Sequence, residues 1–129
     1  MGGMSGRWKI ASFVHLNFMS ADSFVVYYGV RRQVSNDEIV QCETRKHPWI
    51  RAARDAGLQH YWSNFSVEGA EDYLLFVGRQ IGVFGAEGIA QLQISDLEFQ
   101  SIVQDTKLRL ERAGISETPA LHIQYGPDI

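Results

Sequence analysis

The chain has 129 residues, of which 45% are hydrophobic and 21% are charged, and its formal net charge is −3. A chain of this length can bury a core of its own and is typical of a single domain, and its near-average composition excludes extended disorder outside the chain ends. The small negative charge argues against a generic binder of polyanions.

The N-terminal part of the chain predicts a flexible leader followed by two strands. Residues 1–6, MGGMSG, are predicted to be a loose leader. Apolar and polar residues alternate over 8–18, which is typical of a half-buried strand. After a turn at 20–23, the β-branched and aromatic residues of 24–34 predict a second strand, paired with the first in an antiparallel hairpin. Gly29 predicts a bulge or a close approach of two backbones.

Two short helices are predicted next, each from the residues at its ends. Ser35 and Glu38 have the spacing of a capping box, which predicts a helix over about 36–43. Pro48 begins the second helix, because a proline at the first helical position loses no hydrogen bond. Gly57, followed by an apolar residue, ends it in a left-handed cap.

The second helix belongs to the stretch RKHPWIRAARDAGL, residues 45–58, which concentrates cationic side chains around one tryptophan. At 100° per residue, Trp49 and three alanines fall on one side of this helix, and Arg51 and Arg54 fall on the other. We therefore expect a buried stripe of small residues around Trp49 and a solvated basic face.

The middle of the chain is predicted to form four strands. Residues 60–67 predict one strand, and 73–78 predict a central strand because both of its faces are apolar. Gly78-Arg79-Gln80 predicts a tight reversal into a strand over 81–85, which places Arg79 at an exposed hairpin tip. A further strand is predicted over 88–94.

The last part of the chain predicts a long helix and a final strand. A second capping box at Ser95 begins a helix that runs to about residue 113. Leu97 and Leu108 fall on the side opposite its apolar face, where a surface helix is usually polar. Pro119 then precedes a strand over 120–125.

The order of these elements predicts the fold class. Strand-helix-strand-strand-helix-strand is embedded in it, which is the ferredoxin-like split β-α-β arrangement. We therefore predict one α+β domain over 1–129, with a mainly antiparallel sheet of five to seven strands and two main helices on one face.

The motifs of common chemistries are absent from the sequence. Cys42 is the single cysteine, so neither an intrachain disulfide nor a cysteine zinc cage can form. The lack of disulfides fits a reducing compartment, and we predict a cytoplasmic protein. We also predict that Cys42 is buried. No Walker A or dinucleotide-binding fingerprint occurs, and no cofactor is predicted. His15, His60 and His122 fall on predicted strands and would form a metal site only if the sheet brought them together, so no metal is predicted.

Charge is distributed unevenly along the chain. Residues 31–54 hold six basic against three acidic residues, a net of +3, and residues 68–129 hold ten acidic against four basic residues, a net of −6. The basic region could bind phosphates, with Trp49 available for stacking. It could instead attract the acidic region of a second copy, or the charges could simply be the solvated faces of separate elements.

These observations favour a small non-catalytic binding or accessory protein that acts through protein contacts and associates with itself. The first alternative is a small-molecule binder or enzyme with a pocket between sheet and helices. The second is nucleic-acid binding through residues 31–54. The candidate binding residues across these hypotheses are Tyr28, Arg31, Arg51, Arg54, His60 and Arg79.

Overall fold

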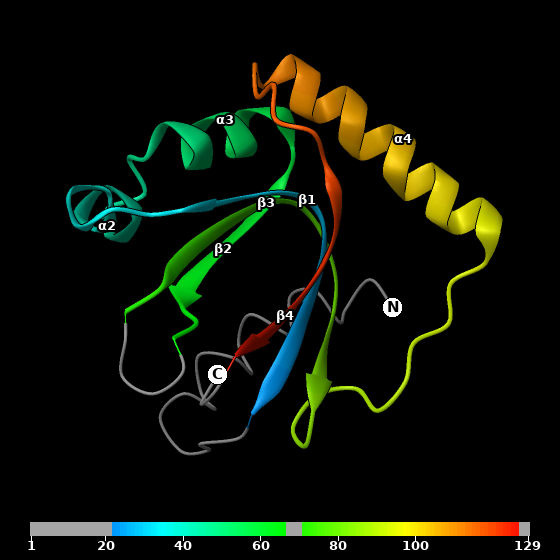
Figure 1. The fold of residues 1–129 in the computed structure, drawn as a ribbon. Coiled ribbons are helices and arrows are strands. Elements are labelled where there is room, and N and C mark those ends of the chain that lie inside the picture. The colour runs from blue at the N-terminus through cyan, green and yellow to red at the C-terminus, as the bar shows by residue number, and fades with distance from the viewer. Residues whose placement is uncertain (1–21, 67–70, 127–129) are drawn as a thin grey trace.

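The computed structural model describes residues 22–66 and 71–126, which form four strands and three helices (Figure 1). The elements are β1 Ser23–Gln33, α2 Asn36–Glu43, α3 Pro48–Ala56, β2 Gln59–Asn64, β3 Tyr73–Gly85, α4 Asp96–Arg112 and β4 Ala120–Gly126. The predicted leader over 1–6 and the predicted strand over 8–18 lie outside the described residues.

The strands form one sheet in the order β2-β3-β1-β4, and every neighbouring pair is antiparallel. The helices α2 and α3 connect β1 to β2, and α4 connects β3 to β4. Each connected pair is separated by one antiparallel strand, so the predicted split β-α-β arrangement is present. Over residues 23–29, β3 and β4 occupy both edges of β1, so no edge is left there for the predicted hairpin with 8–18.

The helices α3 and α4 lie over the same face of the sheet, as predicted (Figure 1). The main core fills the space between them and the two central strands. It contains Val30, Val34, Cys42, Trp49, Ile50, Ala53, Leu75, Val77, Leu110 and Ile115. Thus Cys42 is buried as expected, and the burial of Trp49 removes it as a stacking platform for bases.

A second core cluster lies on the opposite face of the sheet. It contains Val25, Tyr27, Phe65, Leu74 and Phe76. The rings of Tyr27 and Phe76 are 5.4 Å apart, and those of Phe65 and Phe76 are 5.7 Å apart. Both faces of the central strands are therefore buried, which is the reason that 73–78 is apolar throughout.

The three helices begin and end where the local signals predict. Capping boxes at Ser35 and Ser95 start α2 and α4. Gly57 ends α3 in a left-handed conformation with φ 74°, and the N–H of Leu58 donates to the carbonyl of Ala53 at 2.8 Å, which is a Schellman ending. The buried side of α3 also includes Ile50, which the predicted stripe of Trp49 and alanines left out.

The predicted reversal at Gly78-Arg79-Gln80 is wrong, because β3 runs unbroken from Tyr73 to Gly85. Gly78 pairs with Gly29, and both have positive φ, 154° and 158°. A Cβ on Gly78 would lie 2.3 Å from the carbonyl oxygen of Tyr28, so glycine here permits the close approach of two strands. The close approach predicted at Gly29 is thus confirmed, and the sheet has its bulge between Val26 and Tyr27.

The strand predicted over 88–94 is also wrong, since only Ile89 makes a single bridge, to Phe84. A turn closed by the N–H of Gly88 and the carbonyl of Gly85 (3.1 Å) leads into irregular chain. Strand β2 ends at Asn64, whose side-chain oxygen accepts from the N–H groups of Ser66 and Asp72, both at 3.0 Å. The described residues therefore form four strands and not five to seven.

Candidate interaction surface

The first candidate surface is the outer edge of the sheet, at β4. This strand pairs with β1 on one side only within the described residues. None of its residues, Ala120–Gly126, carries a formal charge. The side chains of Leu121 and Ile123 are 48% and 64% exposed, and the neighbouring Phe24 of β1 is 45% exposed. We call Phe24, Leu121 and Ile123, together with the open edge of β4, the edge surface.

Successive side chains of β4 point to opposite faces of the sheet. The exposed apolar side chains therefore lie on one face, and the hydrogen-bonded polar side chains lie on the other. His122 and Gln124 point to the face opposite the helices, where His122 Nε2 is 3.1 Å from the carbonyl oxygen of Gly29. The side-chain oxygen of Gln124 accepts from Arg31 Nη1 at 2.8 Å. Burial lowers the pKa of His122 and nearby Arg31 lowers it further, against the opposing bond to Gly29, so the imidazole is neutral. Hydrogen bonds thus anchor β4 on one side, and its other side is exposed.

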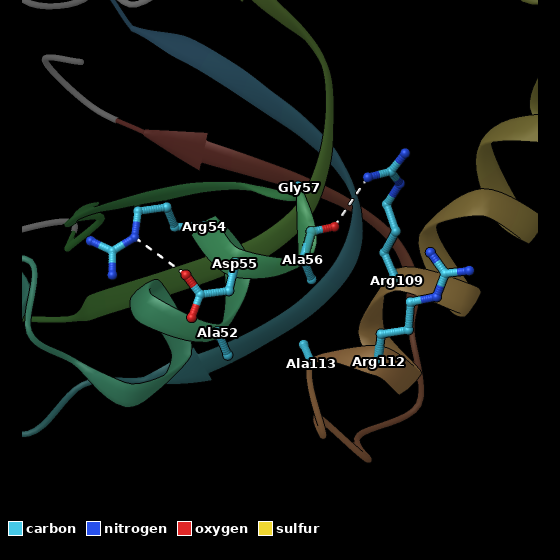
Figure 2. A pocket seen from close by; sticks show the side chains of 8 residues that line it. All are labelled: Ala52, Arg54, Asp55, Ala56, Gly57, Arg109, Arg112 and Ala113. Atoms are coloured by element: carbon cyan, nitrogen blue, oxygen red, sulfur yellow. Dashed lines mark hydrogen bonds and ion pairs between the residues drawn. The ribbon is translucent and has the colours of Figure 1, made fainter.

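The second candidate surface is a groove of about 590 Å³ at the C-terminal ends of α3 and α4 (Figure 2). Its cationic residues are Arg54, Arg109 and Arg112, and its one acidic residue is Asp55. Alanines and Gly57 make up the rest of the lining. We call it the arginine groove.

A partly buried polar network around Glu38 contains the residues that most resemble a catalytic arrangement. Glu38 Oε2 lies 2.7 Å from His47 Nε2 and 2.9 Å from Arg32 Nη2. His47 Nδ1 accepts the N–H of Trp49 at 3.0 Å, which leaves the Nε2 proton to be donated to Glu38. His47 is 1% exposed and caps α3. The network therefore joins β1, α2 and α3, although Arg32 Nε has no hydrogen-bond partner among the described residues.

The electrostatics of this network also argue against nucleophilic chemistry. Burial works to raise the pKa of Glu38, but hydrogen bonds from His47 and Ser35 and the charge of Arg32 lower it to about 2. Burial raises the pKa of Cys42, and the negative charge of Glu38 adds to this effect. A buried cysteine with a raised pKa is held as the thiol, which is the unreactive form.

The six predicted site residues do not come together. Tyr28 is buried against Phe99 of α4, with ring centroids 5.9 Å apart, and His60 lies on the same face in β2. Arg31 points to the opposite face and binds Gln124. Arg51 and Arg54 are exposed on α3, and Arg79 is exposed in the middle of β3, away from any hairpin tip. Tyr28 and Arg31 therefore lie on opposite faces of the sheet and do not line one pocket.

The basic region 31–54 is likewise divided. Arg31 and Arg32 are consecutive in a strand, so their side chains lie on opposite faces. Arg32 is occupied by Glu38 and also lies over the Trp49 ring, 5.2 Å from its centroid. The two strand histidines in the described residues, His60 and His122, lie in the two opposite edge strands of the sheet. No group of three potential metal ligands occurs in residues 22–66 and 71–126.

Sequence reasoning missed Arg109 and Arg112 as members of a site. Basic residues in the last turn are common in helices of any function, because they complement the helix dipole. No sequence signal places Ala56 beside them, because the contact spans 53 residues.

Comparisons with protein families, with curated proteins and with solved structures found no match for this chain. Among the helices of the described part of the chain, none has the length and apolarity needed to span a membrane. The edge surface and the arginine groove are the candidate functional features of the described residues.

Proposed function

We propose that this is a non-catalytic cytoplasmic protein that acts through protein contacts and associates with itself through the edge surface. The observation that supports this proposal is an uncharged edge strand with two exposed branched side chains, Leu121 and Ile123. Edge strands of monomeric proteins usually carry charges, prolines or bulges that prevent pairing with another chain. β4 has none of these along Ala120–Gly126.

Antiparallel pairing of β4 with β4 of a second copy satisfies the geometry of a two-fold dimer. In such a contact the same residues meet from both sides, and the two four-stranded sheets become one. Leu121 and Ile123 of each copy then lie on one face of the joined sheet, where cross-strand apolar pairs stabilise the contact. Fully burying a side chain of this size contributes about 1.5–3 kcal/mol.

The proposal is tested by light scattering after size exclusion, with one matched pair of variants. Leu121 in β4 and Leu108 in α4 are each 48% exposed, so Leu121→Lys and Leu108→Lys add the same charge at equal exposure. We expect the wild type and Leu108→Lys to have the mass of a dimer. We expect Leu121→Lys to have the mass of a monomer with an unchanged melting temperature.

Two outcomes contradict the proposal. One is a wild-type protein that has the monomer mass up to about millimolar concentration, where weak contacts form. The other is dissociation by Leu108→Lys and not by Leu121→Lys, which would place the contact on the outer side of α4.

A further inference from the structure

We propose that the arginine groove binds carboxylate side chains of an acidic segment in a protein partner. This inference concerns a surface separate from the edge surface and does not depend on self-association. Three arginines and one aspartate line the groove, which gives it a net charge of +2.

Arg109 is held in place before any ligand arrives. Its Nε donates to Asp105 Oδ2 at 2.9 Å and its Nη1 donates to the carbonyl oxygen of Ala56 at 3.1 Å. Gly57 leaves the space that this requires, since a Cβ there would lie 2.3 Å from Nη1. These bonds leave Nη2 as a donor, and a fixed guanidinium loses little freedom when it binds a carboxylate.

The other two arginines have little or no pairing with the described residues. Within residues 22–66 and 71–126, the side chain of Arg112 makes no hydrogen bond or ion pair. In the part of the chain that the structure describes, Arg54 pairs with Asp55 at 3.6 Å, and the two side chains are 65% and 77% exposed. An exposed pair at this distance contributes little to stability, so Asp55 does not prevent Arg54 from binding another carboxylate. Both guanidinium groups can therefore bind an incoming anion.

The position of these arginines favours an extended segment over a single small anion. Arg109 and Arg112 project from α4, whereas Arg54 projects from α3 on the other side of the groove (Figure 2). Carboxylates spaced along a peptide can contact arginines on both sides of the groove. The small side chains of Ala52, Ala56 and Ala113 leave room for its backbone.

The same surroundings favour carboxylate over a phosphate dianion. Asp55 lines the groove, and the C-terminal ends of α3 and α4 carry partial negative charge. Arg109 offsets part of that charge at Ala56. Charges spread along a segment match arginines that project from two helices, whereas a phosphate concentrates its charge at one point, so alternating acidic and small residues fit the groove best.

The test measures fluorescence anisotropy of a labelled eight-residue peptide of alternating Glu and Ala. We expect the wild type to bind it at low salt, and a peptide with Gln in place of Glu to bind at least about tenfold more weakly. The double variant Arg54→Gln plus Arg112→Gln should lose about tenfold in affinity. Its matched control, Lys46→Gln plus Arg79→Gln, removes two exposed charges outside the groove and should bind as the wild type does.

Several outcomes overturn the inference. Equal weakening by both double variants would show a general charge effect. Displacement of the peptide by inorganic phosphate, at concentrations where sodium chloride of equal ionic strength has no effect, would make the groove a phosphate site. A change of oligomeric mass in the groove variant would make a second copy the occupant. Leu121→Lys should still bind the peptide, so failure of the dimer proposal is distinguishable from failure of this one.

Discussion

The residues of greatest chemical interest in this molecule serve its folding. Glu38, His47 and Arg32 would suggest acid-base chemistry from their types alone, yet each is bonded to another member of the network or to a helix end. The sequence showed the capping box of Glu38 and the proline after His47. It could not show that His47 reaches back to Glu38, because that contact depends on how the loop between α2 and α3 turns.

The Glu38 network predicts a stability that depends on acid pH. The pKa of Glu38 is lowered from 4.5 to about 2 on folding. Its contribution is therefore present above pH 4.5 and is lost as the pH falls towards 2. We expect Glu38→Gln to lower the free energy of unfolding by about 1–2 kcal/mol at pH 7, after allowance for partial solvent screening.

Urea unfolding at pH 7, 4.5, 3 and 2 measures this effect. The difference in the free energy of unfolding between wild type and Glu38→Gln should decrease from pH 4.5 to pH 3 and again to pH 2. Glu43→Gln, an exposed change in the same helix, is the control and should cost little at any pH. A Glu38→Gln difference that stays constant from pH 7 to 2 would show that the carboxylate charge contributes nothing.

Tyr27 provides a second prediction for a single residue. Its side chain is 1% exposed, and its hydroxyl finds no hydrogen-bond partner among residues 22–66 and 71–126. A buried hydroxyl without a partner costs about 1–3 kcal/mol, so Tyr27→Phe should raise the free energy of unfolding by about 1 kcal/mol.

Alkaline pH gives an independent measurement of the same hydroxyl. Burial raises the pKa of Tyr27, with a smaller effect from Tyr61, so above pH 10 the unfolded state ionises first and the wild type loses stability. Unfolding curves at pH 8 and 11 should show that Tyr27→Phe loses less stability between these two pH values than the wild type does. A variant less stable than wild type at pH 8 would mean that the hydroxyl forms a favourable interaction.

At the scale of elements, the helices were predictable and the strands only in part. Capping boxes, prolines and glycine stops are local signals, and α2, α3 and α4 follow them closely. The turn predicted at Gly78 was wrong because a glycine within an apolar run is typical both of a turn and of two backbones in close contact. Only the partner glycine, 49 positions earlier in β1, decides between them.

The pairing of Gly29 and Gly78 predicts a steric cost for substitution. Gly78→Ala places a Cβ against the carbonyl of Tyr28 in a conformation with positive φ, so we expect a loss of at least about 2 kcal/mol. Gly114 also has positive φ, 75°, but its Cβ would meet nothing within 4 Å. Gly114→Ala should therefore cost about 1 kcal/mol, which is the conformational part alone. Equal losses in thermal or urea unfolding would show that the strands separate to accept the methyl group.

At the scale of the whole molecule, the surfaces arise from topology. Leu121 and Ile123 are ordinary strand residues in the sequence, and they are exposed because β4 is the outer strand and α4 packs over β1 and β3. The arginine groove exists because the ends of α3 and α4 meet across 53 residues. Neither property has a local signature, so the sequence predicted the type of fold and the exposure of Leu108 but not these surfaces.

The connection from β3 through α4 to β4 has a consequence for biosynthesis. β1 is among the first described parts of the chain to leave the ribosome, and its partner β4 is the last, since Ser23 pairs with Gly126. Until translation is nearly finished, one flank of β1 lacks the described strand that pairs with it, and Phe24 lacks the ring of Tyr125, 5.4 Å away in the complete fold. Premature termination near residue 119 would remove that strand altogether, and such fragments should aggregate.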